Sequence, residues 1–157
     1  MDPTASSKQT ASSETPSEPF AYAPISRLIG LQVRPGQPGD AEVVLDAGES
    51  MHNPMGMVHG GVISLLADAA MGIAFGRTLI DQSAFATIEM KVSYLRPVKA
   101  SVLTARAHVV SRGLRIGFVE CVIVNSRNKE IARASCTCTV NSLGDDASAS
   151  RSKPAGV

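Results

Sequence analysis

The stretch from His59 to Ile80 restricts the possible folds more than any other part of this chain. Apolar residues occupy nearly every position, and residue types that favour helices, Ala, Leu and Met, dominate. A helix that is apolar on all sides is buried in a protein core or in a membrane. Asp68 is the only charged side chain between His59 and Arg77, and a carboxylate at the centre of a bilayer costs about 2.5–3.5 kcal/mol. We therefore predict one long helix that is buried almost all round in a folded domain.

Alternating apolar and polar residues elsewhere predict strands. Short strands are expected at 31–35 and 41–47, and longer ones at 84–95, 102–110, 115–125 and 130–140. Residues 25–31 suit a short helix or a turn. In 84–95 the alternation places Met90 and Tyr94 on one face and Thr87 on the other. No helix-length segment separates the last four strands, so we expect an antiparallel meander and, overall, an α+β fold with a curved sheet around the helix.

The two ends of the chain differ in composition from the middle. Residues 1–19 are rich in Ser, Thr and Pro, and Met1 is their only large apolar side chain. Such a segment buries too little apolar surface to offset its conformational entropy, so we expect 1–19 and the similar 143–157 to be disordered tails. One domain over 20–142 remains. The N-terminal segment has neither the apolar core of a signal peptide nor an Arg-rich transit composition, which predicts a cytoplasmic protein.

Charge and cysteine content exclude several classes of function. A formal net charge of +1 gives no reason to expect binding to nucleic acid or to a membrane surface. Cys121, Cys136 and Cys138 match neither a disulfide framework nor a zinc site, and are expected to be small buried side chains. His52 and His59 have no third ligand in helical register, so we predict no metal site.

Asp68 is the residue of the helix that requires an explanation. An ionised carboxylate on a buried helix is costly unless it accepts hydrogen bonds or faces a polar cavity. Two interpretations follow from the residue alone. Asp68 is either a structural side chain with hydrogen-bond donors around it, or a catalytic carboxylate in a pocket.

The start of the helix carries the second candidate feature. The first N–H groups of a helix are unpaired and lie at the positive end of its dipole, and Gly60 and Gly61 carry no side chain that would keep a ligand oxygen away. Such N–H groups can form an oxyanion hole, although glycines at the start of a helix more often serve tight packing alone. Eight residues separate Gly60 from Asp68, or about 12 Å along the helix and about 80° around it. If both act on one substrate atom, Asp68 must come from a second copy of the chain, which predicts a homodimer with shared sites.

Together these residues resemble a known family. Asn53-Pro-Met-Gly-Met-Val-His59-Gly60-Gly61, followed by Leu66-Ala67-Asp68, is similar to the hotdog-fold acyl-CoA thioesterases of the 4-hydroxybenzoyl-CoA thioesterase superfamily, in particular their phenylacetate-pathway (PaaI-like) branch. The segment from Thr87 to Val98 resembles the strand that follows the helix in that family, and the resemblance covers about residues 25–141. It implies the hotdog fold, a helix inside a curled sheet, with homodimers that pair into homotetramers.

The resemblance also implies roles for individual residues. Asp68 would be the nucleophile or the general base, and the N–H of Gly60 would polarise the thioester carbonyl. Asn53 would position the water or the carbonyl, His59 would orient the loop, and Thr87 would hold the attacking water.

An acyl-CoA substrate would bring several phosphate charges, with coenzyme A as part of the substrate and no separate cofactor. From Arg77 to Arg133 there are ten Lys or Arg against four Asp or Glu. Basic residues near strand ends are candidates for the phosphates, although solvated strand ends explain them equally well. They are Arg96, Lys99, Arg112 and Arg115. The acyl group, aromatic or medium-chain, stays open.

Two other functions are compatible with this sequence. A non-catalytic acyl-CoA-binding module would bind the ester without hydrolysis. A hotdog hydratase or dehydratase would pair a His with an acid, whereas Asp68 has no His nearby in helical register.

Overall fold

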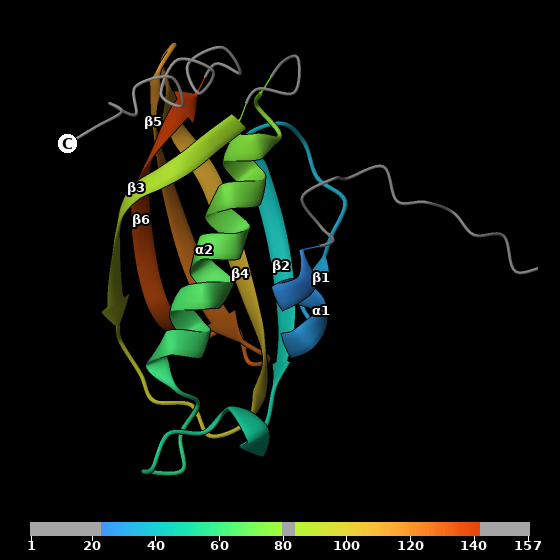
Figure 1. Cartoon of the computed structure of the whole chain (residues 1–157). Coiled ribbons are helices and arrows are strands. Elements are labelled where there is room, and N and C mark those ends of the chain that lie inside the picture. Colours follow the sequence, from blue (N-terminus) through green and yellow to red (C-terminus); the bar gives the residue numbers. More distant parts are fainter. Residues whose placement is uncertain (1–22, 80–83, 142–157) are drawn as a thin grey trace, which may run out of the picture.

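The computed structural model describes residues 23–79 and 84–141 of the chain; the predicted tails at 1–19 and 143–157 lie outside these residues. The elements follow in the order α1 (Pro24–Ile29), β1 (Gln32–Val33), β2 (Asp40–Ala47), the short 3-10 helix η2 (Glu49–Met51), α2 (Gly60–Gly76), β3 (Ala84–Tyr94), β4 (Ser101–Arg112), β5 (Ile116–Asn125) and β6 (Glu130–Asn141). The six strands form one antiparallel sheet in the order β1-β2-β4-β5-β6-β3, which curves around α2 (Figure 1). The α+β architecture and the six predicted strands are confirmed.

Helix α2 lies in the hollow of the sheet and packs its buried side against the inward side chains of the strands. Its sheet-facing side is completely buried and includes small residues, which allow the helix to approach the strands closely. These residues are Leu66, Ala67, Ala70, Met71, Ala74 and Phe75. Inward side chains of the strands meet them, among them Val43, Leu45, Leu103, Ala105, Val119 and Ile123. Within the described part of the chain, no helix is long and apolar enough to cross a membrane.

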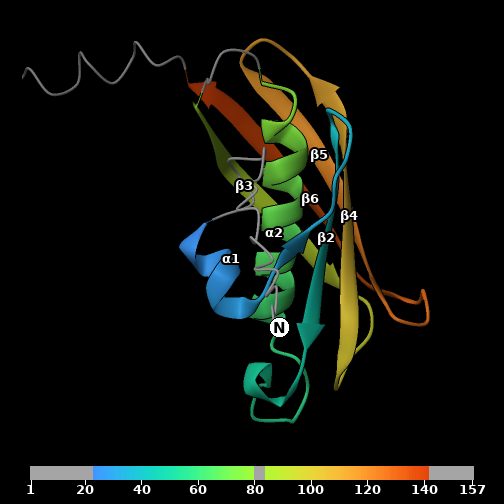
Figure 2. The same cartoon turned by 90° about the vertical axis from the view of Figure 1, so that its right-hand side faces the viewer.

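The outer side of α2 is open, which corrects the prediction of a helix buried almost all round. Gly61 and Asp68 are exposed, and Leu65 and Gly72 are only half-buried. These positions recur at the spacing of one helical face. The sheet covers the opposite face, and α1 leans against only part of the open one (Figure 2).

The predicted meander of the last four strands is wrong in one respect. Strands β4, β5 and β6 are consecutive neighbours, but β3 pairs with β6 at the far edge of the sheet. Both edges of β4 are already occupied, by β2 and by β5, so β3 has no place beside it. Residues 95–100 connect β3 to β4 and pass the N-terminal end of α2 (Figure 1).

A β-bulge in β3 changes which face its residues occupy. The register between β3 and β6 shifts between Thr87 and Glu89, so Ile88 is an extra residue without a partner. As a result Thr87 lies on the helix side together with Met90, whereas strict alternation predicted opposite faces. The bulge therefore brings the Thr87 hydroxyl to α2.

Candidate active site

The N-terminus of α2 has one unpaired N–H. His59 is the N-cap residue, and its Nδ1 accepts a hydrogen bond of 2.9 Å from the N–H of Gly61. The carbonyl oxygen of His59 accepts from the N–H of Val62 at 2.9 Å. The N–H of Gly60 has no acceptor among the residues that the structure describes. Of the two glycines predicted to offer N–H groups, only Gly60 has one available to a ligand.

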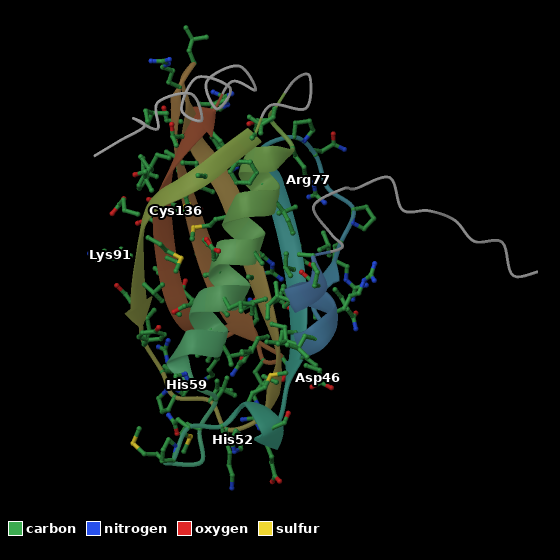
Figure 3. The ribbon with its side chains drawn as sticks, viewed as in Figure 1. Asp46, His52, His59, Arg77, Lys91 and Cys136 are labelled. Atoms are coloured by element: carbon green, nitrogen blue, oxygen red, sulfur yellow. The ribbon has the colours of Figure 1, made fainter. Side chains whose placement is uncertain are left out.

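The loop before α2 is held by the side chain of Asn53. Its Oδ1 accepts hydrogen bonds from the N–H of Met55 at 3.0 Å and of Met57 at 3.2 Å. Gly56 adopts a positive φ of 73° in the same turn, a conformation that glycine takes without strain. Because Oδ1 is occupied, the amide nitrogen Nδ2 of Asn53 is the part of this side chain that can donate to a ligand. Figure 3 shows His59 and His52 at this end of the molecule.

A cavity of about 410 Å³ opens beside Gly60, and we call it the Gly60 cavity. Its lining is mainly apolar and comes from the loop, the first turns of α2 and the segment after β3. The lining residues are Asn53, Met55, Met57, Val58, Gly60, Ile63, Tyr94, Leu95, Arg96, Pro97 and Val98.

Asp68 and Thr87 form the polar edge of a second cavity. The Thr87 hydroxyl donates to Oδ1 of Asp68 at 3.4 Å. Asp68 is exposed in this chain, although the helix that carries it is mostly buried. The physical reason is its position on the open face of α2.

This second cavity, the Asp68 cavity, has a volume of about 260 Å³ between α1, α2 and β3. Apart from Ser26, Asp68 and Thr87, its lining is apolar or glycine. The other lining residues are Ala23, Ile25, Leu31, Leu65, Ala69, Gly72, Ile73 and Phe85. An apolar cleft with a few polar groups at its edge is typical of a small-molecule site.

Asp68 and Gly60 do not converge within one chain. The two cavities share no lining residue, and the two groups are separated by two turns of α2. One chain therefore supplies a carboxylate with a hydroxyl at one place and an unpaired N–H donor at another.

The four predicted phosphate-binding residues divide between the two ends of α2. Arg96 lines the Gly60 cavity and donates to the carbonyl oxygen of Glu130 at 2.7 Å, and Lys99 follows in the same connection. At the other end, the guanidinium of Arg112 lies 5.1 Å from the ring centroid of Phe75. Arg115 belongs to the adjacent β4–β5 turn.

Two polar side chains near the N-terminus of α2, Tyr94 from β3 and Ser64 from the helix itself, were not predicted as site residues. The hydroxyl of Tyr94 donates to the carbonyl oxygen of Gly60 at 3.1 Å, and Oγ of Ser64 lies 2.6 Å from the Tyr94 oxygen. Ser64 follows Gly60 by four residues, so the helical repeat already placed it on the same face as Gly60. Nothing in the sequence indicated that the C-terminal end of β3 lies beside the first turn of α2.

The three cysteines are buried on the sheet behind α2, as predicted (Cys136 in Figure 3). Burial raises the pKa of the Cys121 thiol to about 12, so this side chain stays uncharged. In residues 23–79 and 84–141, no three His, Cys, Asp or Glu side chains are grouped as metal ligands.

Comparisons with known proteins agree on one family. The thioesterase superfamily matches residues 55–132. A 1,4-dihydroxy-2-naphthoyl-CoA hydrolase of Listeria monocytogenes is 27% identical over 74% of this chain and 94% of its own length. The medium/long-chain acyl-CoA thioesterase YigI of Salmonella typhimurium is 27% identical over 78% of this chain and 90% of its own length.

Among solved structures, the PaaI protein from the phenylacetic acid degradation operon of Escherichia coli is similar over 78% of this chain and 87% of its own. The identity is 25% and the TM-score is 0.73. The superfamily match over residues 55–132 includes α2 and β3, which contribute to both cavities. The chain belongs to the thioesterase superfamily and is a hotdog-fold thioester hydrolase that resembles the PaaI-like branch.

Proposed function

We propose that this protein hydrolyses the thioester of an aromatic or medium-chain acyl-CoA in a site that two subunits share. The observation that carries the proposal is the Asp68–Thr87 pair at the edge of an apolar cavity. A carboxylate and a hydroxyl 3.4 Å apart can hold one water molecule beside an acyl group that enters this cavity.

The volume of the Asp68 cavity supports this class of acyl group. A cavity of about 150 Å³ holds benzene in another protein. The 260 Å³ here leaves room for an aromatic ring with a short linker or for a medium-length alkyl chain. The relatives act, by their names, on 1,4-dihydroxy-2-naphthoyl-CoA and on medium- and long-chain acyl-CoA, that is, on one aromatic acyl group and on alkyl chains.

The edge of the sheet supports a homodimer. Strand β3 is 11 residues long and ends the sheet, so one side of its backbone is free to pair with another strand. Ile88 and Tyr94 on this strand are 59% and 53% exposed, and the open face of α2 lies beside it. Two-fold pairing through β3 would set the two α2 helices antiparallel and bring the partner's Gly60 toward Asp68. The predicted assembly of dimers into tetramers remains part of this proposal.

The hydrolysis would proceed as follows. Asp68 removes a proton from the water held with Thr87, and the water oxygen forms a bond to the acyl carbon. The carbonyl oxygen becomes an oxyanion that accepts a hydrogen bond from the N–H of the partner's Gly60. The carbon–sulfur bond then breaks, and the proton on Asp68 passes to the leaving thiolate. The products are a carboxylic acid and free coenzyme A.

The remaining predicted residues have supporting roles in this proposal. The amide of Asn53 contacts the substrate at the Gly60 cavity, and His59 keeps the N–H of Gly61 occupied, which leaves a single donor. Arg96 and Lys99 lie at the end of α2 where the Gly60 cavity opens and are our candidates for the phosphates. The role predicted for Arg112 and Arg115, contact with the phosphates of coenzyme A, requires that the partner subunit place the substrate at their end of α2. We also place the enzyme in the cytoplasm, because its three cysteines are free and disulfides are rare there.

The test is a panel of acyl-CoA esters assayed for release of free thiol, with the wild type and Asp68→Asn. We expect hydrolysis of phenylacetyl-CoA or octanoyl-CoA in preference to acetyl-CoA. The substitution should lower kcat by about 10²–10⁴-fold, because it removes the general base. Asp46→Asn, which changes another exposed carboxylate on β2, is the matched control and should keep the wild-type rate.

Since Asp68 is exposed, the Asn variant should also keep a wild-type circular dichroism spectrum. A folded wild type that hydrolyses no ester of the panel would overturn the proposed function. A folded Asp68→Asn variant with the rate of the wild type would overturn the role of Asp68. Transfer of ¹⁸O from labelled water into Asp68 during a single turnover would show that Asp68 is instead the nucleophile.

A further inference from the structure

The hydroxyl of Tyr94 is bonded to the first turn of α2. Tyr94 is the last residue of β3, and its hydroxyl donates to the carbonyl oxygen of Gly60 at 3.1 Å. Since the phenol hydrogen is used in that bond, the hydroxyl of Ser64, 2.6 Å away, is the donor to the phenol oxygen. The three groups form a chain of hydrogen bonds from Ser64 through Tyr94 to the backbone.

These hydrogen bonds hold one particular peptide group, the one between Gly60 and Gly61. Its carbonyl oxygen is held by Tyr94, and its N–H is held by Nδ1 of His59 at 2.9 Å. Two successive glycines have more backbone freedom than any other pair, and the first N–H groups of a helix lack the intrahelical acceptors that restrain its interior. Both ends of this peptide are nevertheless fixed by side chains from outside the helix.

The absence of a side chain at residue 60 allows this contact. A Cβ atom on Gly60 would lie 3.2 Å from Cζ of Tyr94 and 3.3 Å from its hydroxyl oxygen, closer than an ordinary contact. The phenol ring thus packs directly against the backbone of Gly60. Both residues line the Gly60 cavity, into which the unpaired N–H of Gly60 would donate.

We propose that Tyr94, supported by Ser64, is a positioning residue that keeps the N–H of Gly60 oriented for the substrate carbonyl. The inference rests on the proposed function, in which this N–H stabilises the oxyanion. A donor contributes to catalysis in proportion to how well it is oriented before the reaction. The Gly60 N–H belongs to the preceding peptide, His59–Gly60, which joins the held Gly60–Gly61 peptide at Cα of Gly60. Holding the second peptide restricts rotation about this Cα and so restricts the direction of the Gly60 N–H.

The kinetic test is Tyr94→Phe, which keeps the ring and removes only the hydroxyl. We expect kcat to fall about tenfold, the effect of losing one hydrogen bond that acts in the transition state, with KM unchanged. Ser64→Ala should give a smaller fall in the same direction, since Tyr94 then keeps its own bond. The matched control is Ser93→Ala on the adjacent position of β3, which faces away from α2 and should leave kcat unchanged.

A second readout observes the peptide group itself. Gly60–Gly61 is the only pair of consecutive glycines in the sequence. Protein labelled with carbonyl-¹³C glycine and ¹⁵N glycine therefore gives one signal in an HNCO spectrum, from the Gly60 carbonyl and the Gly61 amide. In Tyr94→Phe we expect the carbonyl resonance to move upfield and the amide to exchange faster with solvent, with no change in Ser93→Ala.

The outcomes separate this inference from the proposed function. An active wild type with unchanged kcat in Tyr94→Phe, or with an unchanged Gly60–Gly61 signal, overturns the positioning role and leaves the thioesterase proposal standing. A fall in kcat together with the altered signal supports it. A wild type without activity on any acyl-CoA overturns the proposed function and, with it, the catalytic part of the inference.

Discussion

Gly72 lies one turn after Asp68 on the open face of α2, where it forms part of the Asp68 cavity. A Cβ atom on Gly72 would lie 3.7 Å from Cζ of Phe85, an ordinary contact. The missing side chain is therefore not required for packing. It leaves space in the cavity instead.

Gly72→Leu should narrow the range of acyl groups. The added side chain would occupy the Asp68 cavity, so kcat/KM should fall at least about tenfold for octanoyl-CoA or phenylacetyl-CoA, the scale of discrimination between apolar groups in a pocket. Acetyl-CoA, which does not reach into the cavity, should be affected little and serves as the internal control. The measurement is the ratio of kcat/KM values on the two esters. An unchanged ratio would mean that the acyl group binds elsewhere.

Among the elements, α2 and β5 approach each other closely at Phe75 and Gly117. Phe75, near the end of α2, is completely buried and packs edge-on against Phe85 with ring centroids 5.5 Å apart. A Cβ atom on Gly117 of β5 would lie 2.2 Å from Cε2 of Phe75, which is shorter than any non-bonded contact between two carbon atoms. Glycine at 117 is what allows the ring to lie against the strand.

Gly117→Ala should lower the free energy of unfolding by about 1–3 kcal/mol, the cost of inserting a methyl group into a packed core. Urea denaturation followed by circular dichroism measures it. Gly48→Ala is the control, since a Cβ atom there has no neighbour within 4 Å and the change should stay within about 0.5 kcal/mol. Equal stability of the two variants would show that Phe75 can move and that the contact is not restrictive.

The elements also show how far sequence reasoning extends. Alternation and the apolar stretch predicted the helix and all six strands, because both patterns reflect the repeat of the element itself. The bulge at Ile88 was not predicted, since an extra residue leaves no mark in a pattern of apolar and polar side chains. It places Thr87 on the helix side together with Met90, whereas alternation predicted that these two residues lie on opposite faces. The resemblance to the thioesterases, rather than the pattern, was what named Thr87 as a site residue.

The error about the burial of α2 has a different origin. The sequence isolated the Asp68 carboxylate correctly as the one charge on an apolar helix. Apolar residues around a helix, however, do not distinguish a side covered by the same chain from a side that is open. In this chain the outer side of α2 is open, and Asp68 is exposed on it.

For the whole molecule, the central question is whether one chain holds a complete site. Asp68 and the N–H of Gly60 line different cavities, so a shared site requires a second subunit. The N–H can be removed by Gly60→Pro. His59, with ψ of 134°, suits a residue before proline, and proline is well tolerated at the first position of a helix. Gly60→Ala keeps the N–H and adds a side chain, so it controls for the contact with Tyr94.

The most direct measurement is the activity of a heterodimer that contains one Asp68→Asn subunit and one Gly60→Pro subunit, purified through two different tags. Each parent homodimer should be nearly inactive. If the sites are shared, one site of the heterodimer combines the intact Asp68 with the intact Gly60, and the activity should return to about half of the wild-type value. A heterodimer as inactive as its parents would contradict the shared site, because it would show that each chain must supply both groups itself.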